Sequence, residues 1–359
     1  MTRRHRGRRA RTITTAAGDI RLSRIYFECL PCREGACLLD RRIGVDGRYS
    51  RNAQRLICLA ASSWSYDVSS DRMEEFCGLK ISDTTIRRVA QEHGATINEW
   101  LRNDPEAVRE FREETGDTEF TTDGTCVNTT EGWREMKVGI FSKRDRGESA
   151  KIDEWSSRVL PTPKTRIAFA AIECSHRFGS RWKAWRKRLG LADTSAVTVL
   201  ADGAKWIWEE QRQHLPGADG VLDIFHAVEP LAAASRVLHE DVDEASRWLE
   251  TARVALLKDG YSGIYDLCQA VEGATAEQAA AVDALLSYLA PHEQHLQFAQ
   301  RLAAGRSIGS GQVEGACKNL IGRRIKANAA RWRVRRVNRM AGLCSLMYSH
   351  QWQNYWNAT

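Results

Sequence analysis

The strongest constraint on the fold lies between residues 118 and 225, where short runs rich in β-branched and apolar residues are separated by turn-like or helical stretches. Such runs are typical of strands. A Thr-Glu-Gly turn joins the first two runs. A helical stretch with Trp182, Trp185 and Leu189 on one face follows the third run, and another helical stretch follows the fourth. The expected strands are 118–128, 133–143, 166–172, 196–201 and 221–225. A three-stranded meander followed by alternating helix and strand predicts a mixed α/β sheet.

Three acidic residues stand out in this pattern. Asp123 and Asp202 each end an apolar run and precede a glycine, and Glu314 begins a helix-like basic segment. In the predicted topology the first and fourth strands are neighbours, with both aspartates at their ends. Close carboxylates repel unless cations lie between them, and their oxygens suit hard divalent ions. We therefore expect Asp123, Asp202 and Glu314 to hold two Mg²⁺ (or Mn²⁺) ions for phosphoryl transfer. The alternatives are ordinary Asp-Gly turns and a surface glutamate.

A histidine follows the fifth expected strand, in the stretch DIFHAVEP. His226 is a candidate catalytic residue that would hydrogen-bond to phosphate or position a catalytic aspartate. A packed histidine with no catalytic role is the alternative.

Positive charge gathers in two places. Residues 1–18 carry six arginines and no acid, and residues 318–339 carry nine basic side chains and no acid, although the net charge is only +7. Clustered Arg and Lys attract polyphosphate, and counterion release drives that binding. We expect the second cluster to form a basic helix that holds DNA through Lys318, Arg323, Arg324, Lys326, Arg331 and Arg335. A solvated charged face is the alternative.

A helix-turn-helix is expected within residues 70–94. After a helix in residues 50–64 that begins at the cap-like Ser50, a short helix would run to Cys77, with a turn at Gly78 and a second helix at about 83–92 capped by Ser82. Such a second helix enters the major groove of DNA. The side chains left on its outer face are Thr85, Arg87, Arg88 and Gln91, beside Thr84. An ordinary helical hairpin is the alternative.

Ten cysteines are scattered along the chain, without the density of a disulfide framework. Cys29 and Cys32 have the spacing of a zinc knuckle, and Cys37 could supply a third ligand. A structural zinc site normally takes four ligands, and the sequence offers no second pair. A hairpin turn that happens to carry thiols is the alternative.

The rest of the chain completes a five-part organisation. Residues 227–304 show helical composition throughout, and a glycine-rich loop at 305–312 precedes Val313. The expected parts are a basic segment with a strand at 19–28 and the Cys pair (1–49), a helical DNA-binding region (50–116), the first part of a catalytic core (117–226), a helical insertion (227–305) and the end of the core with a basic helix (306–359). The sequence shows no secretory signal and no apolar run of membrane length. We therefore expect a cytoplasmic, nucleoid-associated bacterial protein.

Four stretches together carry a family resemblance: TTDGT, LADGAKWIW, LDIFHAVEPL and GSGQVEGACKNLIGRRIKANAARW. From about residue 19 onward the chain resembles DDE transposases of bacterial insertion sequences, in particular the Kra-type (ISKra) group of the Mutator-like assemblage. The resemblance implies a ribonuclease-H-like core interrupted by a helical insertion, with Asp123, Asp202 and Glu314 as the catalytic triad. It also implies that Asp223 and His226 form the accompanying Asp-x-x-His element.

The same resemblance implies a transposase that cleaves DNA strands at insertion-sequence ends and transfers them to target DNA. Its partners would be double-stranded DNA at the element ends and the target, and a second copy of the chain when DNA is bound. Relatives typically have a further cysteine pair upstream of the first strand, which the sequence given does not contain. The alternative function is therefore a non-catalytic, N-terminally truncated relative that binds element ends as a repressor.

Overall fold

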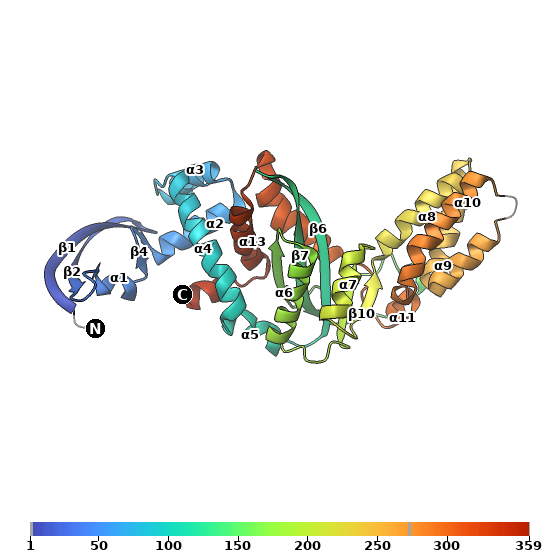
Figure 1. Cartoon of the computed structure of the whole chain (residues 1–359), viewed down its shortest axis with the longest axis horizontal. Coiled ribbons are helices and arrows are strands. Elements are labelled where there is room, and N and C mark those ends of the chain that lie inside the picture. Colours follow the sequence, from blue (N-terminus) through green and yellow to red (C-terminus); the bar gives the residue numbers. More distant parts are fainter. Residues whose placement is uncertain (1–2, 272–273, 359) are drawn as a thin grey trace.

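The computed structural model describes residues 3–271 and 274–358. Its described residues form two five-stranded sheets and many helices, arranged as an elongated molecule with a β-hairpin at one end and a helical bundle at the other (Figure 1). The mixed α/β class expected from the sequence is confirmed. None of the described helices has both the length and the apolar character that crossing a bilayer requires.

The arginine-rich start is a strand. It pairs antiparallel with the strand expected at 19–28, and an irregularity between His5 and Arg8 interrupts the ladder. The resulting sheet has the order β3-β2-β1-β5-β4. Its elements are β1 (Arg3–Thr15), β2 (Gly18–Cys29), β3 (Gly35–Ala36), α1 (Leu38–Arg42), β4 (Val45–Asp46) and β5 (Tyr49–Ser50).

Four helices follow, and two of them match the expected helical pair. The left-handed Gly78 ends the first, and the Ser82 side chain accepts a hydrogen bond from the Thr85 amide to cap the second. The second helix is longer than expected, because it continues to Asn103 and packs against the C-terminal helix α13 (Val334–Tyr348). The elements are α2 (Arg51–Ser63, capped by Ser50 as expected), α3 (Tyr66–Cys77), α4 (Asp83–Asn103) and α5 (Glu106–Glu113).

The central sheet has the strand order β10-β9-β6-β7-β8. β6, β7 and β8 form an antiparallel meander, whereas β9 pairs parallel with β6, and β10 pairs parallel with β9. The expected adjacency of the first and fourth strands is therefore confirmed. The strands are β6 (Asp117–Thr129), β7 (Gly132–Arg144), β8 (Thr165–Ala171), β9 (Val197–Ala201) and β10 (Asp219–Leu222). The prediction that the last strand reaches residue 225 is wrong, because Asp223 caps a helix there.

Aromatic side chains form the core beneath this sheet. Phe120 of β6 lies 4.8 Å from Trp182, and Phe169 of β8 lies 5.3 Å from Phe178, measured between ring centroids. Both partners belong to α6 (Ser175–Arg188), which packs beside α7 (Lys205–His214). A short 3₁₀ turn, η1 (Ile152–Glu154), interrupts the connection between β7 and β8.

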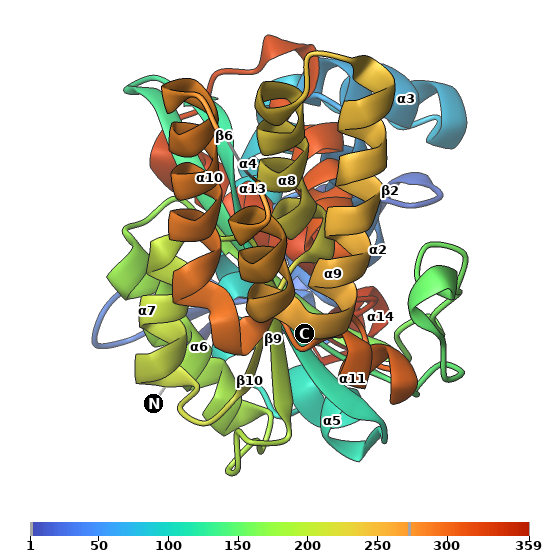
Figure 2. The ribbon, with the colours of Figure 1, turned by 90° about the vertical axis from the view of Figure 1, so that its right-hand side faces the viewer.

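The expected helical insertion is helical and projects from the sheet (Figures 1 and 2). Its elements are α8 (Ile224–Leu238), α9 (Val242–Gln269), α10 (Ala276–Leu289), η2 (Ala290–His295) and α11 (Phe298–Ala303). A kink at Gly260, with φ 61°, bends α9 where its backbone passes Leu296.

The C-terminal part is helical but interrupted, so the prediction of one basic helix through 318–339 is wrong. Trp332 pairs with the end of β6 instead: its amide donates to Asn128 O at 3.1 Å, and its carbonyl accepts from Thr130 N at 2.8 Å. The elements are α12 (Gly311–Ala316), the π-helix η3 (Cys317–Lys326), η4 (Ala327–Ala329), α13 (Val334–Tyr348) and α14 (Trp352–Ala358). Trp352, Tyr355 and Trp356 are buried, as core packing predicts.

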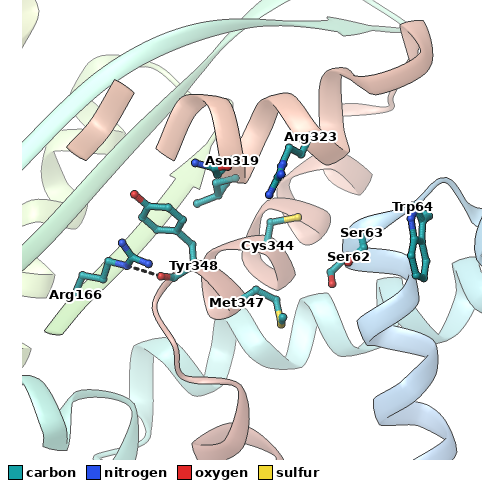
Figure 3. A pocket seen from close by; sticks show the side chains of 10 residues that line it. Ser62, Ser63, Trp64, Arg166, Asn319, Arg323, Cys344, Met347 and Tyr348 are labelled. Carbon is teal, nitrogen blue, oxygen red and sulfur yellow. Dashed lines mark hydrogen bonds between the residues drawn. The ribbon is translucent and has the colours of Figure 1, made fainter. Parts of the chain in front are cut away.

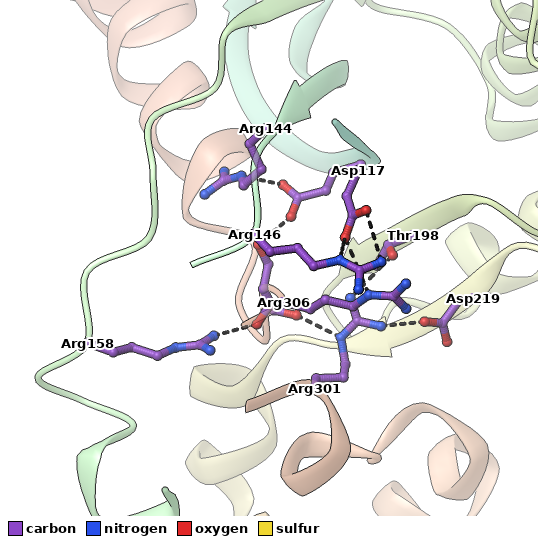
Figure 4. Close-up of polar contacts among 10 residues, drawn as sticks. Asp117, Arg144, Arg146, Arg158, Thr198, Asp219, Arg301 and Arg306 are labelled. Carbon is purple, nitrogen blue, oxygen red and sulfur yellow. Dashed lines mark hydrogen bonds and ion pairs between the residues drawn. The ribbon is translucent and has the colours of Figure 1, made fainter. Parts of the chain in front are cut away.

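A buried ionic network fixes the loop that precedes α12 (Figure 4). Arg301 pairs with Asp219 of β10 and donates to Ser307 O at 2.8 Å and to Thr198 of β9 at 3.2 Å. Glu119 of β6 accepts from the Ser307 hydroxyl and pairs with Arg144 at 2.9 Å. The network therefore joins four neighbouring strands to the segment that leads to Glu314.

Candidate active site

Two aspartates lie at the same level on neighbouring strands. The parallel ladder between β6 and β9 ends at the pair Thr121 and Leu200. Asp123 lies two residues beyond Thr121, and Asp202 lies two residues beyond Leu200. The same register therefore matches Asp123 to Asp202. Residues matched in parallel strands lie side by side, which brings the two carboxylates to one edge of the ladder. Asp123 does not end its strand, contrary to expectation, because β6 continues to Thr129 in the hairpin with β7.

The environment of Asp123 raises the pKa of its carboxyl group. Burial is the main cause, and the nearby charge of Asp202 acts in the same direction, against the lowering effects of hydrogen bonds and of His226. One carboxylate oxygen accepts from the Gly124 amide at 2.6 Å, and the other lies 3.7 Å from the Cys317 thiol. Burial and the charge of Asp123 raise the pKa of Cys317 to about 12, so this thiol stays protonated near neutral pH.

Asp202 is held by the start of α7 and is approached by the helical insertion. Its side chain accepts from the Ala204 amide at 2.9 Å, and its carbonyl accepts from the Trp208 indole at 3.0 Å. Tyr288 of α10 lies against the adjacent glycine, since a Cβ on Gly203 would come within 2.4 Å of the tyrosine oxygen. Burial, with the charges of Asp202, Glu229 and Asp223, raises the pKa of Tyr288 to about 12. The sequence pattern gave no signal for Tyr288, because a single tyrosine in an apolar helix resembles a core residue.

Asp223 is a third aspartate at this edge, and its oxygens are occupied. The amides of Phe225 and His226 donate to one oxygen at 2.7 and 3.2 Å, which caps α8. The Ser310 amide and hydroxyl both donate to the other, the hydroxyl at 2.8 Å. The buried Asp223 therefore anchors the loop before α12. His226 lies in the first turn of α8, half exposed, with its ring 3.6 Å from Glu229.

Glu314 lies on α12, which packs against β6 and β7. Its side chain is 66% exposed and pairs with Lys318 at 2.6 Å. Glu314 is one turn before Cys317, whose thiol contacts Asp123, and its charge contributes to the raised pKa of that thiol. The structure therefore places Asp123 and Asp202 together and brings the Glu314 helix over β6, with the glutamate side chain turned to Lys318.

Two of the expected DNA-binding side chains are buried, so those predictions are wrong. Gln91 donates to the Tyr66 hydroxyl at 3.2 Å and to Arg336 O at 3.1 Å, because α13 covers that face of α4. Arg324 donates to Ala61 O at 2.6 Å and lies over the rings of Tyr66 and Trp332. Burial lowers the pKa of Arg324. Both residues hold α2, α3 and α4 against the C-terminal segment.

The other expected DNA-binding residues remain at the surface. Thr85 is half-buried, whereas the basic side chains at positions 87, 88, 318, 323, 326, 331 and 335 are exposed. Arg88 pairs with Glu92 at 2.7 Å, and Lys326 donates to Thr125 of β6 at 2.5 Å. Arg323 lines a cavity of about 670 Å³ between α2, η3 and α13 (Figure 3). Arg166, a second cation in that cavity, donates to Tyr348 O at 2.6 Å.

The cysteine pair lies where β2 turns toward β3. The Cys29 amide donates to Glu34 O at 2.8 Å, and Arg33 adopts a left-handed backbone there, with φ 61°. Hydrogen bonds from Cys32 lower the pKa of Cys29, which favours its thiolate, the form that binds metal. Cys29 is buried, Cys32 is exposed and Cys37 is intermediate.

No protein-family model matches the chain, and no curated protein matches it significantly.

Proposed function

We propose that this chain is a metal-dependent DDE-type DNA transposase, built on a ribonuclease-H-like core with a helical insertion. The observation that carries the proposal is the register match of Asp123 and Asp202 on adjacent parallel strands, with each carboxylate within range of the other's charge. The strand order supports it, since the first strand is central, between its hairpin partner and the fourth strand. The insertion also falls where the resemblance requires it, between the last strand and Glu314.

The donor set fits hard divalent ions. Each carboxylate can accept about four hydrogen bonds or metal contacts. Asp123 accepts from one amide and one weak thiol donor, and Asp202 accepts from the Ala204 amide. Two Mg²⁺ or Mn²⁺ ions would be held by Asp123, Asp202 and Glu314. Bound there, they would activate the attacking oxygen and stabilise the leaving oxygen of a phosphodiester.

The remaining residues would position the reacting groups. Asp223 fixes the loop before α12 through Ser310 and thereby sets where Glu314 stands. Tyr288, whose phenol is protonated near pH 7, would donate a hydrogen bond beside Asp202. Exposed basic side chains on η3 and the start of α13 would hold DNA phosphates, while the first turn of α4 would take part in reading sequence. DNA-bound chains would assemble as homo-oligomers.

The test is DNA cleavage by the full chain on a duplex that carries the ends of its own insertion sequence, with Mg²⁺ and with Ca²⁺. We expect cleavage with Mg²⁺ that frees a 3′-hydroxyl, followed by joining to target DNA. Asp202→Asn should abolish cleavage and leave DNA binding nearly intact, because the substitution removes one anionic ligand and keeps the shape. If a folded Asp202→Asn protein still cut DNA, the proposed site would be wrong.

One observation favours the alternative of a non-catalytic DNA-binding repressor. Glu314 is paired with Lys318 and exposed, rather than turned toward the two aspartates. The two functions differ in a single assay: the repressor would bind the same ends tightly and leave them uncut with either Mg²⁺ or Mn²⁺.

A further inference from the structure

A second group of metal-ligating side chains lies between α6 and α7, apart from the acidic edge of the sheet. His176 stands in the first turn of α6, and Glu210 and His214 stand one turn apart at the end of α7. One ligand atom from each of the three lies within 4.8 Å of the others. Glu210 and His214 are buried, and His176 is exposed, so the group opens to solvent on one side.

The buried atoms of this group lack ordinary partners. Nε2 of His214 lies 3.0 Å from Oε2 of Glu210, yet neither atom makes a well-aligned hydrogen bond within the described chain, and Nδ1 of His214 also has no partner there. Buried polar atoms without partners are costly and call for a missing ligand.

The backbone of α6 makes room for the carboxylate. A Cβ on Gly179 would lie 2.0 Å from Oε2 of Glu210 and 2.8 Å from the His214 ring. Any larger residue there would therefore displace both side chains. Glycine inside a helix is less favourable than alanine, and here it allows the two α7 ligands to approach α6.

We propose that His176, Glu210 and His214 form a Zn²⁺ site that joins the start of α6 to the end of α7. Two imidazoles and one carboxylate are a donor set of three-ligand zinc sites, in which water fills the fourth position. Imidazole nitrogen favours zinc over magnesium. The site is distinct from the proposed Mg²⁺ site, and the inference does not depend on the proposed function.

The experiment measures zinc bound to the purified full chain after chelator treatment, dialysis against Zn²⁺ and removal of free metal. All proteins carry Cys32→Ser, which removes an exposed thiol of the cysteine pair as a competing zinc ligand. The variants are His176→Ala, at an exposed position that should not disturb folding, and the near-isosteric Glu210→Gln. The control is His239→Ala, a partly exposed histidine at the end of α8.

We expect one zinc per chain in the parent and in His239→Ala, and an affinity loss of at least about 100-fold in the other two variants. Zinc should raise the melting temperature of the parent and of His239→Ala, but not that of His176→Ala or Glu210→Gln. Bound Co²⁺ should give a spectrum without thiolate bands. The inference is overturned if the parent binds no zinc, or if His176→Ala and Glu210→Gln bind it as tightly as the control. In either case Glu210 and His214 would be a buried ion pair only.

Discussion

The two aspartates at the parallel edge illustrate how a single residue's surroundings set its chemistry. Asp123 is partly desolvated and shares its neighbourhood with the Asp202 charge, so its ionised form is disfavoured in the metal-free protein. A cation between the carboxylates would remove that penalty. The acidic pair is thus unfavourable for folding alone and favourable for metal binding.

The raised pKa of Asp123 determines the sign of a pH effect on stability. The folded-state pKa of Asp123 lies above its ordinary value of 3.8. Its stabilising contribution is therefore complete below that value and is lost as the pH rises through the folded pKa. In chelator, Asp123→Asn should melt at a higher temperature than the parent near pH 7, with the gain vanishing toward about pH 4. Added Mg²⁺ should stabilise the parent and leave the variant unchanged.

Thermal unfolding at the two pH values measures this effect. Asp71→Asn, at an exposed position, is the matched control and should shift the melting temperature little at either pH. A lower melting temperature for Asp123→Asn near pH 7 without metal would mean that the ionised carboxylate stabilises the fold.

Two adjacent arginines should have opposite roles. Arg324 is buried over Tyr66 and Trp332 and satisfies Ala61 O, whereas Arg323 is exposed at the cavity of Figure 3. Arg324→Ala should lower the free energy of unfolding by about 2–3 kcal/mol, since it removes a charge-assisted hydrogen bond in the interior. Arg323→Ala should change stability by less than about 0.5 kcal/mol and weaken DNA binding.

Urea unfolding and a DNA-binding titration on both variants check the pair. If Arg324→Ala kept full stability and lost DNA binding, the arginine would have to leave its buried position when DNA binds.

At the scale of elements, helix ends connect the site to the rest of the chain. Asp223 caps α8 and also receives the amide and hydroxyl of Ser310, 87 residues later. Asp241 caps α9 with the same two-amide geometry but is exposed. The two caps therefore differ mainly in the hydrogen bonds that Asp223 also makes to the loop before α12.

This difference can be measured by alanine substitution. Asp241→Ala should cost about 1 kcal/mol, the usual value of an N-cap. Asp223→Ala should cost about 1–3 kcal/mol more, because it also leaves buried Ser310 groups unpaired. Equal losses by urea unfolding would show that the Ser310 contacts add nothing to stability.

Elements with a strong local period were predictable, whereas those fixed by distant contacts were not. Runs rich in apolar and β-branched residues located β6 to β9, and Ser50, Gly78 and Ser82 located helix ends, because these signals depend on neighbours in sequence. The composition of residues 318–339 favours one continuous helix, but the pairing of Trp332 with the end of β6 interrupts that helix. The π-helical turn of η3 has no propensity signal of its own.

The residues of the candidate site also fall into two groups: those that local sequence signals predicted and those whose position depends on distant contacts. Asp123 and Asp202 were found because each ends an apolar run and precedes a glycine, and the strand order places those runs side by side. The burial of Gln91 depends on α13, more than 200 residues away, and the burial of Arg324 depends on α2 and α3. A periodicity that leaves Gln91 on the outer face of α4 cannot reveal such contacts. The cluster of His176, Glu210 and His214 needs two helices side by side, a contact that spacing within one helix does not encode.

At the scale of the whole molecule, basic surface lies on the body and on the β-hairpin. Exposed arginines are spread over η3 and α13, while β1 extends as a separate arm (Figure 1). We predict that Arg323→Ala with Arg335→Ala weakens binding to specific and random DNA alike. The slope of log affinity against log salt should flatten by up to about 2, or 0.9 for each phosphate contact.

The matched control is Arg247→Ala with Lys258→Ala, two exposed cations of α9 in the projecting bundle. It should leave both the affinity and the slope nearly unchanged. If the control flattened the slope as much as the test pair, DNA would run along the bundle rather than across η3.

The ionic network of Figure 4 can form completely only late in the synthesis of the chain. Glu119 and Arg144 are made early, but Ser307 and Gln312, which satisfy Glu119, lie 188 and 193 residues downstream of it. A ribosome adds roughly 5–20 residues per second, so a nascent chain holds these charges without all of their partners for roughly ten seconds or more. A chain that stopped before Ser307 would leave the centre of its sheet open, which makes such fragments targets for degradation rather than smaller working proteins.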